Sequence, residues 1–460
     1  MRSKSGRFRS VAIFVTYFVV ALILMPYHAW ALDESNSVKT VTIQISKQGA
    51  VPISPLLYGI NYDWNAVPAS QAKKFASTMK DVSHVTLVRY PGGWNAEAYN
   101  WSNNTERPWR KASKVTGVDP HTILKLFPEV SFITPSGRAI KDPAEAKSIA
   151  KLSASLVRRY GDQVRYWEIG NEWWLQRGAK KNEKNREENL ARYAHLLDVV
   201  VPRMKRANPA IKIFATSEWQ SPEDMQRLRS LTGEKVWKQI DGISLHTYCG
   251  TVGVLCSSLP DAVAKIRSTS GKSLFYASEW AVVRHHAPDD FGIRNADYTV
   301  DAIRDMVFAR IQLGAYWPPV REIRAMSFES ANYQNPFATG IVFGWMSRFY
   351  EGIALHASGD PHAVAAMNHS AVTVLVPSYQ KNREVVRIAL SGTGMTRVAS
   401  ARVLYSEAPD DVNSSLPAKV AILPTHLTHD KNGKTYVEFV LNPGTQGRGG
   451  AYEIAKVILK

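Results

Sequence analysis

The chain is poor in cysteine, has no long apolar segment after its N-terminus, and carries fewer acidic than basic residues. Two cysteines among 460 residues exclude a disulfide-rich scaffold and a cysteine-based zinc cluster. Beyond residue 31, no segment has the roughly 20 apolar residues that a membrane-spanning helix requires. Asp and Glu number 40 against 57 Lys and Arg, a net charge of +17 that favours either a polyanionic partner or simple solubility.

What is present is the composition of a globular protein. Hydrophobic residues make up 45% and aromatic residues 10%, which excludes wholesale disorder. The length allows two or three domains, or one large α/β barrel with an accessory domain. No zinc-finger spacing, arginine-rich arm or aromatic ribonucleoprotein motif occurs, so we expect no nucleic-acid partner.

The first 31 residues have the layout of a secretory signal peptide. A basic start is followed by an apolar run over Val11–Met25 and by the small-x-small triplet Ala29–Ala31. The apolar run is shorter than a membrane span, so we expect cleavage rather than retention as an anchor. Cleavage would leave a secreted or periplasmic protein with no membrane association and a net charge of +13.

Short apolar segments alternate with helical ones up to about residue 350. Eight strands are expected at Leu57–Tyr62, Val85–Tyr90, Val130–Thr134, Val164–Gly170, Ile211–Thr216, Gly242–His246, Leu274–Ser278 and Ile323–Phe328. The clearest helices are expected at Pro143–Arg159, Glu187–Asn208 and Ala296–Leu313. Eight such units predict a (β/α)8 TIM barrel. A doubly wound sheet is the rival, which is weakened because no glycine-rich phosphate-binding motif follows the first strand.

From about Glu351 the pattern changes to alternating strands without helices between them. These strands are expected at Ala371–Pro377, Val385–Ser391, Arg397–Tyr405 and Tyr436–Leu441. They predict a C-terminal β-sandwich, and the lone early strand Val38–Ser46 is expected to join it. The predicted domains are the signal peptide 1–31, the N-terminal strand segment 32–56, the catalytic barrel 57–350 and the β-sandwich 351–460.

Two glutamates follow strands of the predicted barrel at equivalent places. Glu172 follows the fourth strand and Glu279 the seventh, 107 residues later, and each lies beside tryptophan. Because the active site of such a barrel lies at the carboxyl ends of its strands, both side chains are expected to face one cleft. Glycosidic cleavage needs one protonated carboxyl group and one carboxylate in that arrangement. The pair therefore favours a glycoside hydrolase that uses no cofactor.

The sequence resembles the clan of retaining glycoside hydrolases with a (β/α)8 barrel, and within it most closely the α-L-arabinofuranosidase family. The clan has an Asn-Glu acid/base after strand four and a Glu nucleophile after strand seven. The matching motifs are Tyr58-Gly59, Arg89–Gly93, Tyr99–Trp101, Tyr166–Glu172 and Ser244–Tyr248. The likeness covers most of residues 38–460, and the order of barrel then sandwich also matches, but only the strand-end motifs are specific.

The resemblance implies a role for each matching residue. Glu172 would be the general acid and then the general base, and Glu279 would be the nucleophile. Asn171 would hydrogen-bond the sugar hydroxyl next to the anomeric carbon. Arg89 and Tyr248 would hold Glu279 ionised and oriented, because an opposite charge and hydrogen bonds favour a carboxylate.

Other positions of the site match less closely. The resemblance implies that His246 lies near the acid/base, and that Asp63 makes the first-strand sugar contact with a shorter side chain than the usual Glu. Trp94 separates the two glycines from Asn95, the residue expected to grip the sugar. Glu168 makes the motif EIGNE, which is more similar to the β-glucuronidase/heparanase and β-xylosidase branches. These departures leave the terminal sugar open and the two-carboxylate mechanism untouched.

Two further glutamates compete for roles in the barrel. Glu218 follows the fifth strand and is the rival nucleophile, although its position one unit after Glu172 favours Glu279. Glu168 shares the strand parity of Glu172 and is expected to be a buried partner of Arg89 or another inward cation.

The segment after the seventh strand bears on the charge of the substrate. Arg284, His285 and His286 are adjacent there, but no carboxylate or third histidine lies at ligand spacing, so we expect no metal. Together with the net charge, these residues lean towards an acidic substrate. Glu329 is a further candidate for substrate contact, and 332–335 for the cleft wall.

Five tryptophans fall at predicted strand ends: Trp64, Trp94, Trp173, Trp174 and Trp280. Core packing is the usual fate of tryptophan, but five on one rim favour at least two sugar platforms. We expect Trp94, Trp173 and Trp280 to contact substrate. Cys249 and Cys256 lie seven residues apart on one loop, and in an oxidising compartment a disulfide is favoured over two free thiols.

Taken together, these patterns predict a secreted retaining glycoside hydrolase that cleaves a polysaccharide or oligosaccharide in the manner of an α-L-arabinofuranosidase. One alternative is a glycosidase for an acidic exopolysaccharide or a uronic-acid-containing glycan, similar to a β-glucuronidase. The other is a carbohydrate-binding protein that has kept the barrel and lost turnover. The sequence predicts no oligomeric state.

Overall fold

The computed structural model describes residues 38–106, 116–249, 256–282, 293–320, 333, 336–378, 383–405, 418–442 and 453–460, with only the backbone at 179–181 and 294. Within these ranges, no helix combines the length and apolar character needed to cross a membrane. The signal peptide, Glu329, the cleft-wall segment 332–335 and the basic segment 284–286 lie outside the described residues, apart from Tyr333.

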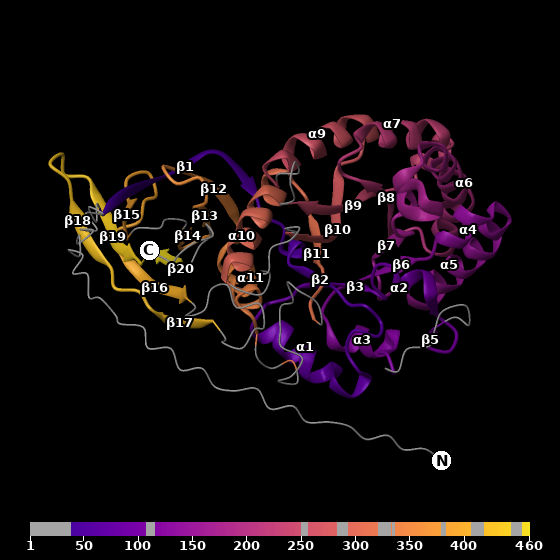
Figure 1. Cartoon of the computed structure of the whole chain (residues 1–460), viewed down its shortest axis with the longest axis horizontal. Helices are drawn as coiled ribbons and strands as arrows, with labels where there is room; N and C mark the ends of the chain where they lie inside the picture. Colours follow the sequence, from indigo (N-terminus) through magenta and orange to yellow (C-terminus); the bar gives the residue numbers. More distant parts are fainter. Residues whose placement is uncertain are drawn as a thin grey trace, which may run out of the picture. The chain divides into compact units, whose positions relative to one another are not determined.

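Eight parallel strands close into a barrel (Figure 1). In chain order they are β2 (Gly59–Asn61), β3 (Leu87–Tyr90), β6 (Val130–Thr134), β7 (Tyr166–Ile169), β8 (Lys212–Glu218), β9 (Gly242–Cys249), β10 (Leu274–Val282) and β11 (Leu313–Tyr316). The order around the barrel follows the chain, and β11 pairs with β2 to close it. The predicted TIM barrel is therefore confirmed.

The eighth barrel strand is not the one that the sequence predicts. Ile323–Phe328 lies outside the described residues, and the strand that closes the barrel is β11, at Leu313–Tyr316. This segment follows a helix closely and continues its apolar pattern, so the helix expected over Ala296–Leu313 extends to its first residue. In the structure that helix is α10, which ends at Phe308.

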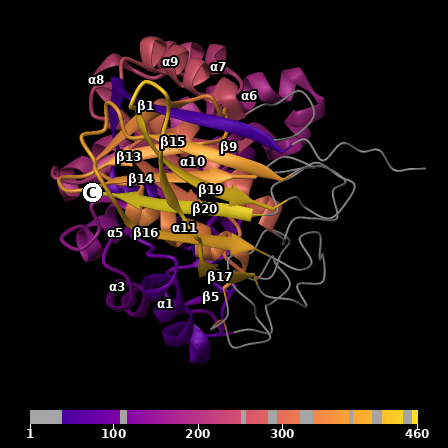
Figure 2. The ribbon, with the colours of Figure 1, turned by 90° about the vertical axis from the view of Figure 1, so that its left-hand side faces the viewer.

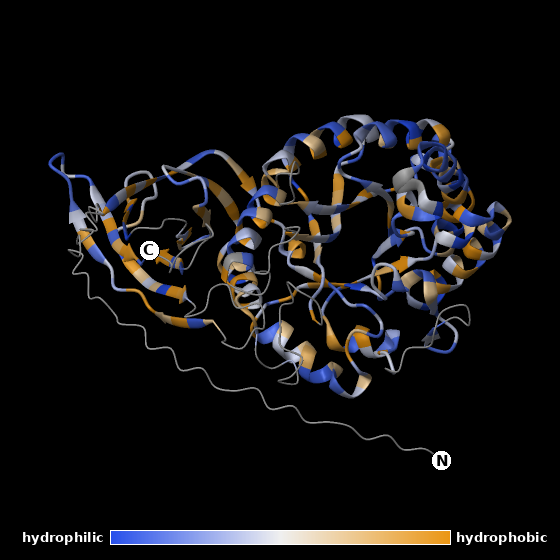
Figure 3. Cartoon of the chain, in the orientation of Figure 1, coloured by the Kyte–Doolittle hydropathy of each residue, from blue (hydrophilic) through white to orange (hydrophobic). Residues whose placement is uncertain are grey.

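One longer helix follows each strand and lies outside the barrel (Figure 1). These helices are α1 (Ala72–Asp81), α3 (Pro120–Leu126), α5 (Ala146–Tyr160), α6 (Glu183–Ala207), α7 (Pro222–Leu231), α9 (Leu259–Ser270), α10 (Ile293–Phe308) and α11 (Ala338–Phe349). Three short helices lie in the connections: α2 (Asn95–Ala98), α4 (Gly137–Lys141) and α8 (Glu234–Trp237). Figure 3 shows hydrophobic residues along the strands and hydrophilic ones on the outer helices α6 and α7.

The 3-10 segments are η1 (Pro55–Leu57), η2 (Ala69–Gln71), η3 (Pro143–Glu145), η4 (Trp173–Lys181) and η5 (Cys256–Ser258). Local sequence explains where the best predicted helix begins. The Asp142 side chain accepts a hydrogen bond from the Ala144 amide, and Pro143 occupies the first helical position, so η3 leads into α5.

The remaining long sheet has ten strands and is built mostly from the C-terminal part of the chain (Figure 2). Its strands are β1 (Lys39–Pro52), β12 (Ile353–Ser358), β13 (Val364–Met367), β14 (Val372–Pro377), β15 (Glu384–Ala389), β16 (Val398–Tyr405), β17 (Lys419–Ile422), β18 (His426–His429), β19 (Thr435–Leu441) and β20 (Glu453–Leu459). A small hairpin joins β4 (Tyr99–Asn100) and β5 (Thr105–Glu106). The predicted fold class, a barrel with a C-terminal sandwich, is confirmed.

Strand β1 connects the two halves of this sheet. Its first part, Lys39–Ile43, pairs in parallel with β15, and its second part, from Gln44 onwards, pairs antiparallel with β12. The N-terminal strand therefore does join the C-terminal sheet. The two halves enclose their own apolar core, to which Ile43, Val374 and Val457 belong.

The inside of the barrel is layered. The lowest layer is apolar and consists of Leu87, Tyr166, Phe214, Tyr276, Leu313 and Ala315. Inward-facing residues alternate along a strand, so the next inward positions towards the carboxyl ends form a second layer. This second layer is polar and lies beneath the residues at the carboxyl ends of the strands. It includes Arg89, Glu168, Thr216 and Ser278.

Candidate active site

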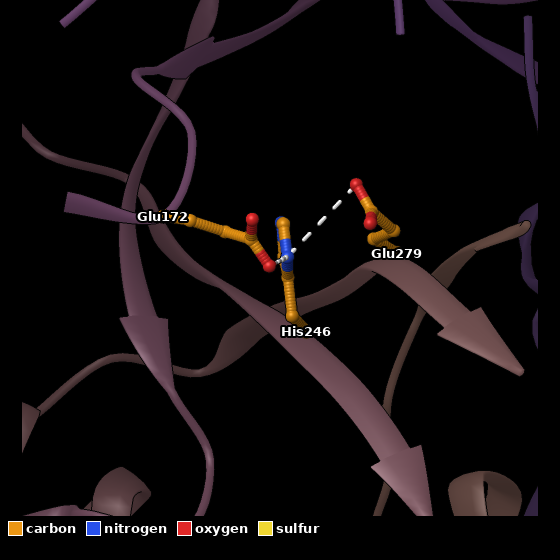
Figure 4. Close-up of side chains that lie close together, drawn as sticks. All are labelled: Glu172, His246 and Glu279. Atoms are coloured by element: carbon orange, nitrogen blue, oxygen red, sulfur yellow. Dashed lines mark hydrogen bonds and ion pairs between the residues drawn. The ribbon is translucent and has the colours of Figure 1, made fainter. Parts of the chain in front are cut away.

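Glu172 and Glu279 meet at the carboxyl ends of the barrel strands. One carboxylate oxygen of each, together with a ring nitrogen of His246, lies within 4.8 Å of the others. Figure 4 shows the His246 ring between the two carboxylates. Glu279 is 8% exposed, and the Glu172 side chain is 21% exposed. The structure thus brings together, at one end of the barrel, the two carboxylates that the sequence singles out.

A bulge in β10 directs Glu279 into the cleft. Pairing with β9 shifts register between Ala277 and Glu279, so Ser278 and Glu279 both face inward. Arg89 Nη1 lies 3.0 Å from Glu279 Oε2, and the Tyr248 hydroxyl donates to Oε1 over 2.5 Å. A Cβ on Gly93 would lie 2.5 Å from Oε2, so only glycine permits this approach. The carboxylate is therefore held on three sides.

Arg89 is fully buried and organises the layer beneath the two carboxylates. Its guanidinium donates to Glu168 over 2.5 Å, to Asn61 over 2.8 Å and to Asn171 over 2.9 Å, besides Glu279. Its pKa stays above the ordinary range because the Glu168 and Glu279 carboxylates outweigh the effect of burial. Glu168 is 1% exposed and is thus the buried partner of Arg89, as the sequence predicts.

The ionisation of Glu172 is coupled to His246. His246 Nδ1 lies 3.1 Å from Glu172 Oε1 and 3.9 Å from Glu279 Oε2. Burial favours the protonated acid, but the hydrogen bond and charge of His246 outweigh it and lower the pKa of Glu172. Burial also lowers the pKa of His246, and the two carboxylates more than compensate and raise it. At a pH between the two pKa values, these shifts favour a protonated His246 beside an ionised Glu172.

Asp63 and Asn95 lie beside this pair. Burial, followed by the charge of Glu279, raises the pKa of Asp63 to about 6, although hydrogen bonds from Trp317 and Asn95 oppose the shift. Trp317 Nε1 lies 3.3 Å from Asp63 Oδ2. Asp63 and Asn95 are both partly exposed.

The structure corrects two of the three expected tryptophan contacts. Trp173 and Trp280 are each 1% exposed. Trp280 follows the inward-facing Glu279 on β10 and points to the opposite side, whereas Trp173 begins η4 and donates to the Thr216 carbonyl. Trp173 stacks on Tyr193, and Trp280 stacks on Phe343 of α11. Both are core residues and have no face free for a sugar. Trp64 and Trp174 are also buried, with exposures of 4% and 3%.

Trp94 is different, since 47% of it is exposed. It follows Gly93 at the beginning of α2 and keeps an open indole face. Among the tryptophans at predicted strand ends, it is the one that remains available as a sugar platform in the described part of the chain.

Glu218, the rival nucleophile, is engaged elsewhere. Arg186 Nη2 lies 2.7 Å from Glu218 Oε2 and also contacts Asp224. This ion-paired cluster leaves Glu279 as the carboxylate that faces Glu172. Cys249 and Cys256 are joined by a disulfide bond.

Glu172, His246 and Glu279 offer three ligand atoms, but the arrangement suits proton exchange better than metal binding. The Glu279 oxygen nearest to His246 already binds the guanidinium of Arg89. A cation placed among the three would lie next to that buried positive charge.

Sequence reasoning missed two residues of the site. Asn61, in β2, donates to the carbonyl oxygens of Ser278 in the bulged strand β10 and of Ala315 in β11, and so ties these three strands together. Trp317 contacts Asp63 and stands edge-on to Tyr248. Asn61 lies two residues before Asp63. Because alternate residues of a strand face the same side, this spacing could have identified Asn61 as a second inward-facing residue. Trp317 was missed because the eighth strand was misplaced.

Solved structures of glycoside hydrolases share this fold. The family 51 α-L-arabinofuranosidase AbfB from Bifidobacterium longum superposes with a TM-score of 0.63 at 15% identity, over 91% of this chain and 99% of that one. The family 51 arabinofuranosidase from Xanthomonas axonopodis pv. citri gives 0.62 at 15%, over 92% and 100%. A family 44 xyloglucanase from Paenibacillus polymyxa gives 0.58 at 13%, over 92% and 100%.

These likenesses are in structure rather than in sequence. No family model matches the chain, and no curated protein matches it in sequence. At 13 to 15% identity, the likeness establishes the fold that the sequence resemblance predicts. The chemistry has to be argued from the side chains at the cleft.

Proposed function

We propose that the protein is a retaining glycoside hydrolase in which Glu279 is the nucleophile and Glu172 the acid/base. The observation that carries the proposal is the pair itself, whose nearest oxygens lie within 4.8 Å. Retaining glycosidases have their two carboxyl groups about 5 to 5.5 Å apart, whereas inverting ones need about 6.5 to 9.5 Å to admit water. The short separation supports the retaining mechanism.

In the first step, a Glu279 oxygen attacks the anomeric carbon while the bond to the leaving oxygen breaks. Glu172 gives that oxygen its proton, so a glycosyl ester of Glu279 and a free alcohol result. Arg89 and Tyr248 keep Glu279 ionised and aimed, since both hydrogen-bond its carboxylate. In the second step, Glu172 takes a proton from water, whose oxygen attacks the same carbon and releases Glu279.

The proton for the first step comes from His246. In the ligand-free site it lies on the imidazole, 3.1 Å from the acceptor oxygen of Glu172. Bound substrate covers the exposed part of Glu172, and this loss of solvation favours the protonated acid. A proton transfer along the existing hydrogen bond then makes Glu172 the acid that the reaction needs.

Asn171 is oriented to bind a sugar hydroxyl. Its Oδ1 accepts from Arg89 Nη2 at 2.9 Å, and this bond leaves the amide NH2 on the side of Glu172, 3.5 Å from that carboxylate. A donor there can hold the hydroxyl next to the anomeric carbon, a contact that strengthens in the transition state. Asp63, whose charge interacts with that of Glu279, and its hydrogen-bond partner Asn95 provide further polar groups.

We propose a polysaccharide or oligosaccharide as the substrate, cleaved in the manner of an α-L-arabinofuranosidase. One alternative is an acidic or uronic-acid-containing glycan, and the observation that supports it is the net charge of +17. Export also remains a proposal. It is supported by the N-terminal pattern and by the disulfide, which persists in oxidising compartments. N-terminal sequencing of the protein purified from its natural host would test cleavage after Ala31.

The mechanism is tested by chemical rescue. With a panel of dinitrophenyl glycosides, whose leaving group needs no acid, Glu279→Gly should lose turnover by several orders of magnitude and regain it with azide. The product should be a glycosyl azide of inverted configuration. Glu218→Gly is the matched control and should keep turnover without azide. Rescue at Glu218→Gly instead would refute the assignment of Glu279.

The second candidate, a carbohydrate-binding protein without turnover, makes a different prediction. It requires that no glycoside of the panel is cleaved while glycans bind tightly. Full retention of Glu172, Glu279 and their hydrogen-bond partners favours the enzyme, because a binding role alone does not need two carboxylates at this distance.

A further inference from the structure

One cavity of the protein is lined by residues that lie close in sequence to Gly93 and Glu172. Its volume is about 240 Å³, and it is lined by Trp94, Glu97, Gly137, Arg138, Lys141 and Gln176. Trp94 follows Gly93, which touches Glu279, and Gln176 lies four residues after Glu172. The cavity is smaller than the roughly 300 to 1,000 Å³ of sites for drug-sized ligands, a size that suits one sugar residue.

The backbone that carries Gln176 is fixed in an unusual conformation. Arg177 and Gly178 have left-handed φ values of +57° and +69°, which interrupt the helical segment η4. Asn189, fully buried on α6, donates to the carbonyl oxygens of Gln176 and Trp173 over 2.7 and 3.1 Å. The Gln176 side chain, 4% exposed, is therefore held at the cavity by a strained turn that α6 supports.

Two donors at the cavity have no acceptor among the described residues. Gln176 Nε2 is buried without a hydrogen-bond partner, and so is Arg138 Nε. The terminal Nη1 of Arg138 is paired with Glu145 Oε2 at 3.1 Å, which holds the guanidinium in place but leaves Nε free. A buried donor without an acceptor costs stability, so the two donors favour an oxygen-bearing partner at this cavity.

The charges at the cavity favour an anion. Glu97 is the one carboxylate that lines it, and its two oxygens accept from Ser136 and Gly137 at 2.7 to 3.0 Å. Its charge is thereby bound to backbone and hydroxyl groups. Arg138 and Lys141 add two positive charges, and Lys141 is exposed. Because Glu145 pairs with Arg138, the exposed Lys141 is the cation of the lining that stays available to an anionic ligand among the described residues.

We propose that this cavity is a subsite for an acidic sugar residue, one that bears a carboxylate or a sulfate, next to the residue held at the catalytic pair. The sugar ring stacks on Trp94, and its anionic group accepts from Gln176 Nε2 and Arg138 Nε and pairs with Lys141. The proposal rests on the proposed function and names the class of substrate, an acidic glycan, that the same cleft takes.

The test compares small probes that differ only in the group at carbon 6, which is a carboxylate, a sulfate ester or a neutral hydroxymethyl group. Binding of D-glucuronate, glucose 6-sulfate and glucose to the full chain is measured by isothermal titration calorimetry at low ionic strength. An acidic sugar should bind at least tenfold more tightly than glucose, and added salt should weaken it. Glucuronate and glucose 6-sulfate distinguish the two sources of charge. Equal affinity for all three sugars would overturn the proposal.

Variants assign the binding to this cavity. Lys141→Gln and Trp94→Ala should each weaken binding of the acidic sugar at least fivefold, with unchanged circular dichroism. Lys151→Gln, an exposed lysine on α5, is the control and should bind as the wild type does. Undiminished binding in both cavity variants would refute the site.

The catalytic pair is tested separately. Glu172→Gln should abolish turnover of aryl glycosides and keep the binding of the acidic sugar. Acidic-sugar binding in a chain that cleaves no glycoside would sustain the subsite and refute the proposed enzyme. Turnover without any preference for acidic sugars would sustain the proposed enzyme and refute the subsite.

Discussion

The hydroxyl of Tyr248, at the end of β9, donates a hydrogen bond of 2.5 Å to Oε1 of Glu279 on the neighbouring strand β10. The other oxygen, Oε2, is bound by Arg89. Each carboxylate oxygen thus has its own donor, one from the neighbouring strand β9 and one from β3, which does not pair with β10. This arrangement fixes both the charge and the direction of the proposed nucleophile.

Removing the Tyr248 hydroxyl should slow the first chemical step. A hydrogen bond to a charged group contributes about 1.5 to 3 kcal/mol. If most of it acts in the transition state, Tyr248→Phe lowers kcat/KM by about 10- to 100-fold. Steady-state kinetics with an aryl glycoside measure the change.

The matched control is Tyr436→Phe in the ten-stranded sheet. Its hydroxyl donates to the Asp430 carboxylate over 3.0 Å, a bond of the same kind outside the barrel. This variant should keep full activity. Equal losses in both variants would mean that a lost phenol affects the whole fold rather than Glu279.

Trp280 and Trp94 should respond oppositely to truncation. Trp280→Ala leaves a cavity against Phe343 and Tyr316, so the free energy of unfolding should fall by about 3 to 5 kcal/mol. Trp94→Ala removes a side chain that is 47% exposed, so stability should change by no more than about 0.5 kcal/mol while KM rises. Urea unfolding and kinetics on the same preparations measure both effects. A large loss of stability in Trp94→Ala would contradict its placement at the surface.

Asp63 should make stability depend on pH. Its pKa is raised from 3.8 to about 6 in the folded protein, so between these values the folded state binds more protons than the unfolded chain. The free energy of unfolding should therefore fall as the pH rises through this window. The loss should be roughly 1 to 2 kcal/mol, less than the full shift because Asp63 is partly exposed.

Asp63→Asn removes this titration and should flatten the stability profile between about pH 4 and 7. The exposed Asp162→Asn serves as the control and should follow the wild-type profile. Urea unfolding at several pH values measures the difference. Parallel profiles for Asp63→Asn and wild type would show that Asp63 titrates normally in the folded protein.

Local sequence was enough to locate the two carboxylates and most of the frame that carries them. Seven of the barrel strands are short apolar segments bounded by turns, and each places its last polar residues at one end of the barrel. Glu172 and Glu279 could therefore be assigned from their position after strands four and seven. Arg89, Asn171, His246 and Tyr248 occupy strand ends in the same way, and the structure gathers them around the pair.

Tertiary structure decided the rest, because it depends on contacts between segments far apart in the chain. The bulge that turns Glu279 inward is a shift in the pairing of β10 with β9. The sequence of β10 contains no residue from which the bulge could be predicted. The same pairing sends Trp280 outward against α11. Leu313–Tyr316 is a strand because a gap between β10 and β2 needs one, although its apolar pattern also fits the preceding helix. The cavity beside Trp94 likewise forms only where α2, α4 and the turn after β7 meet.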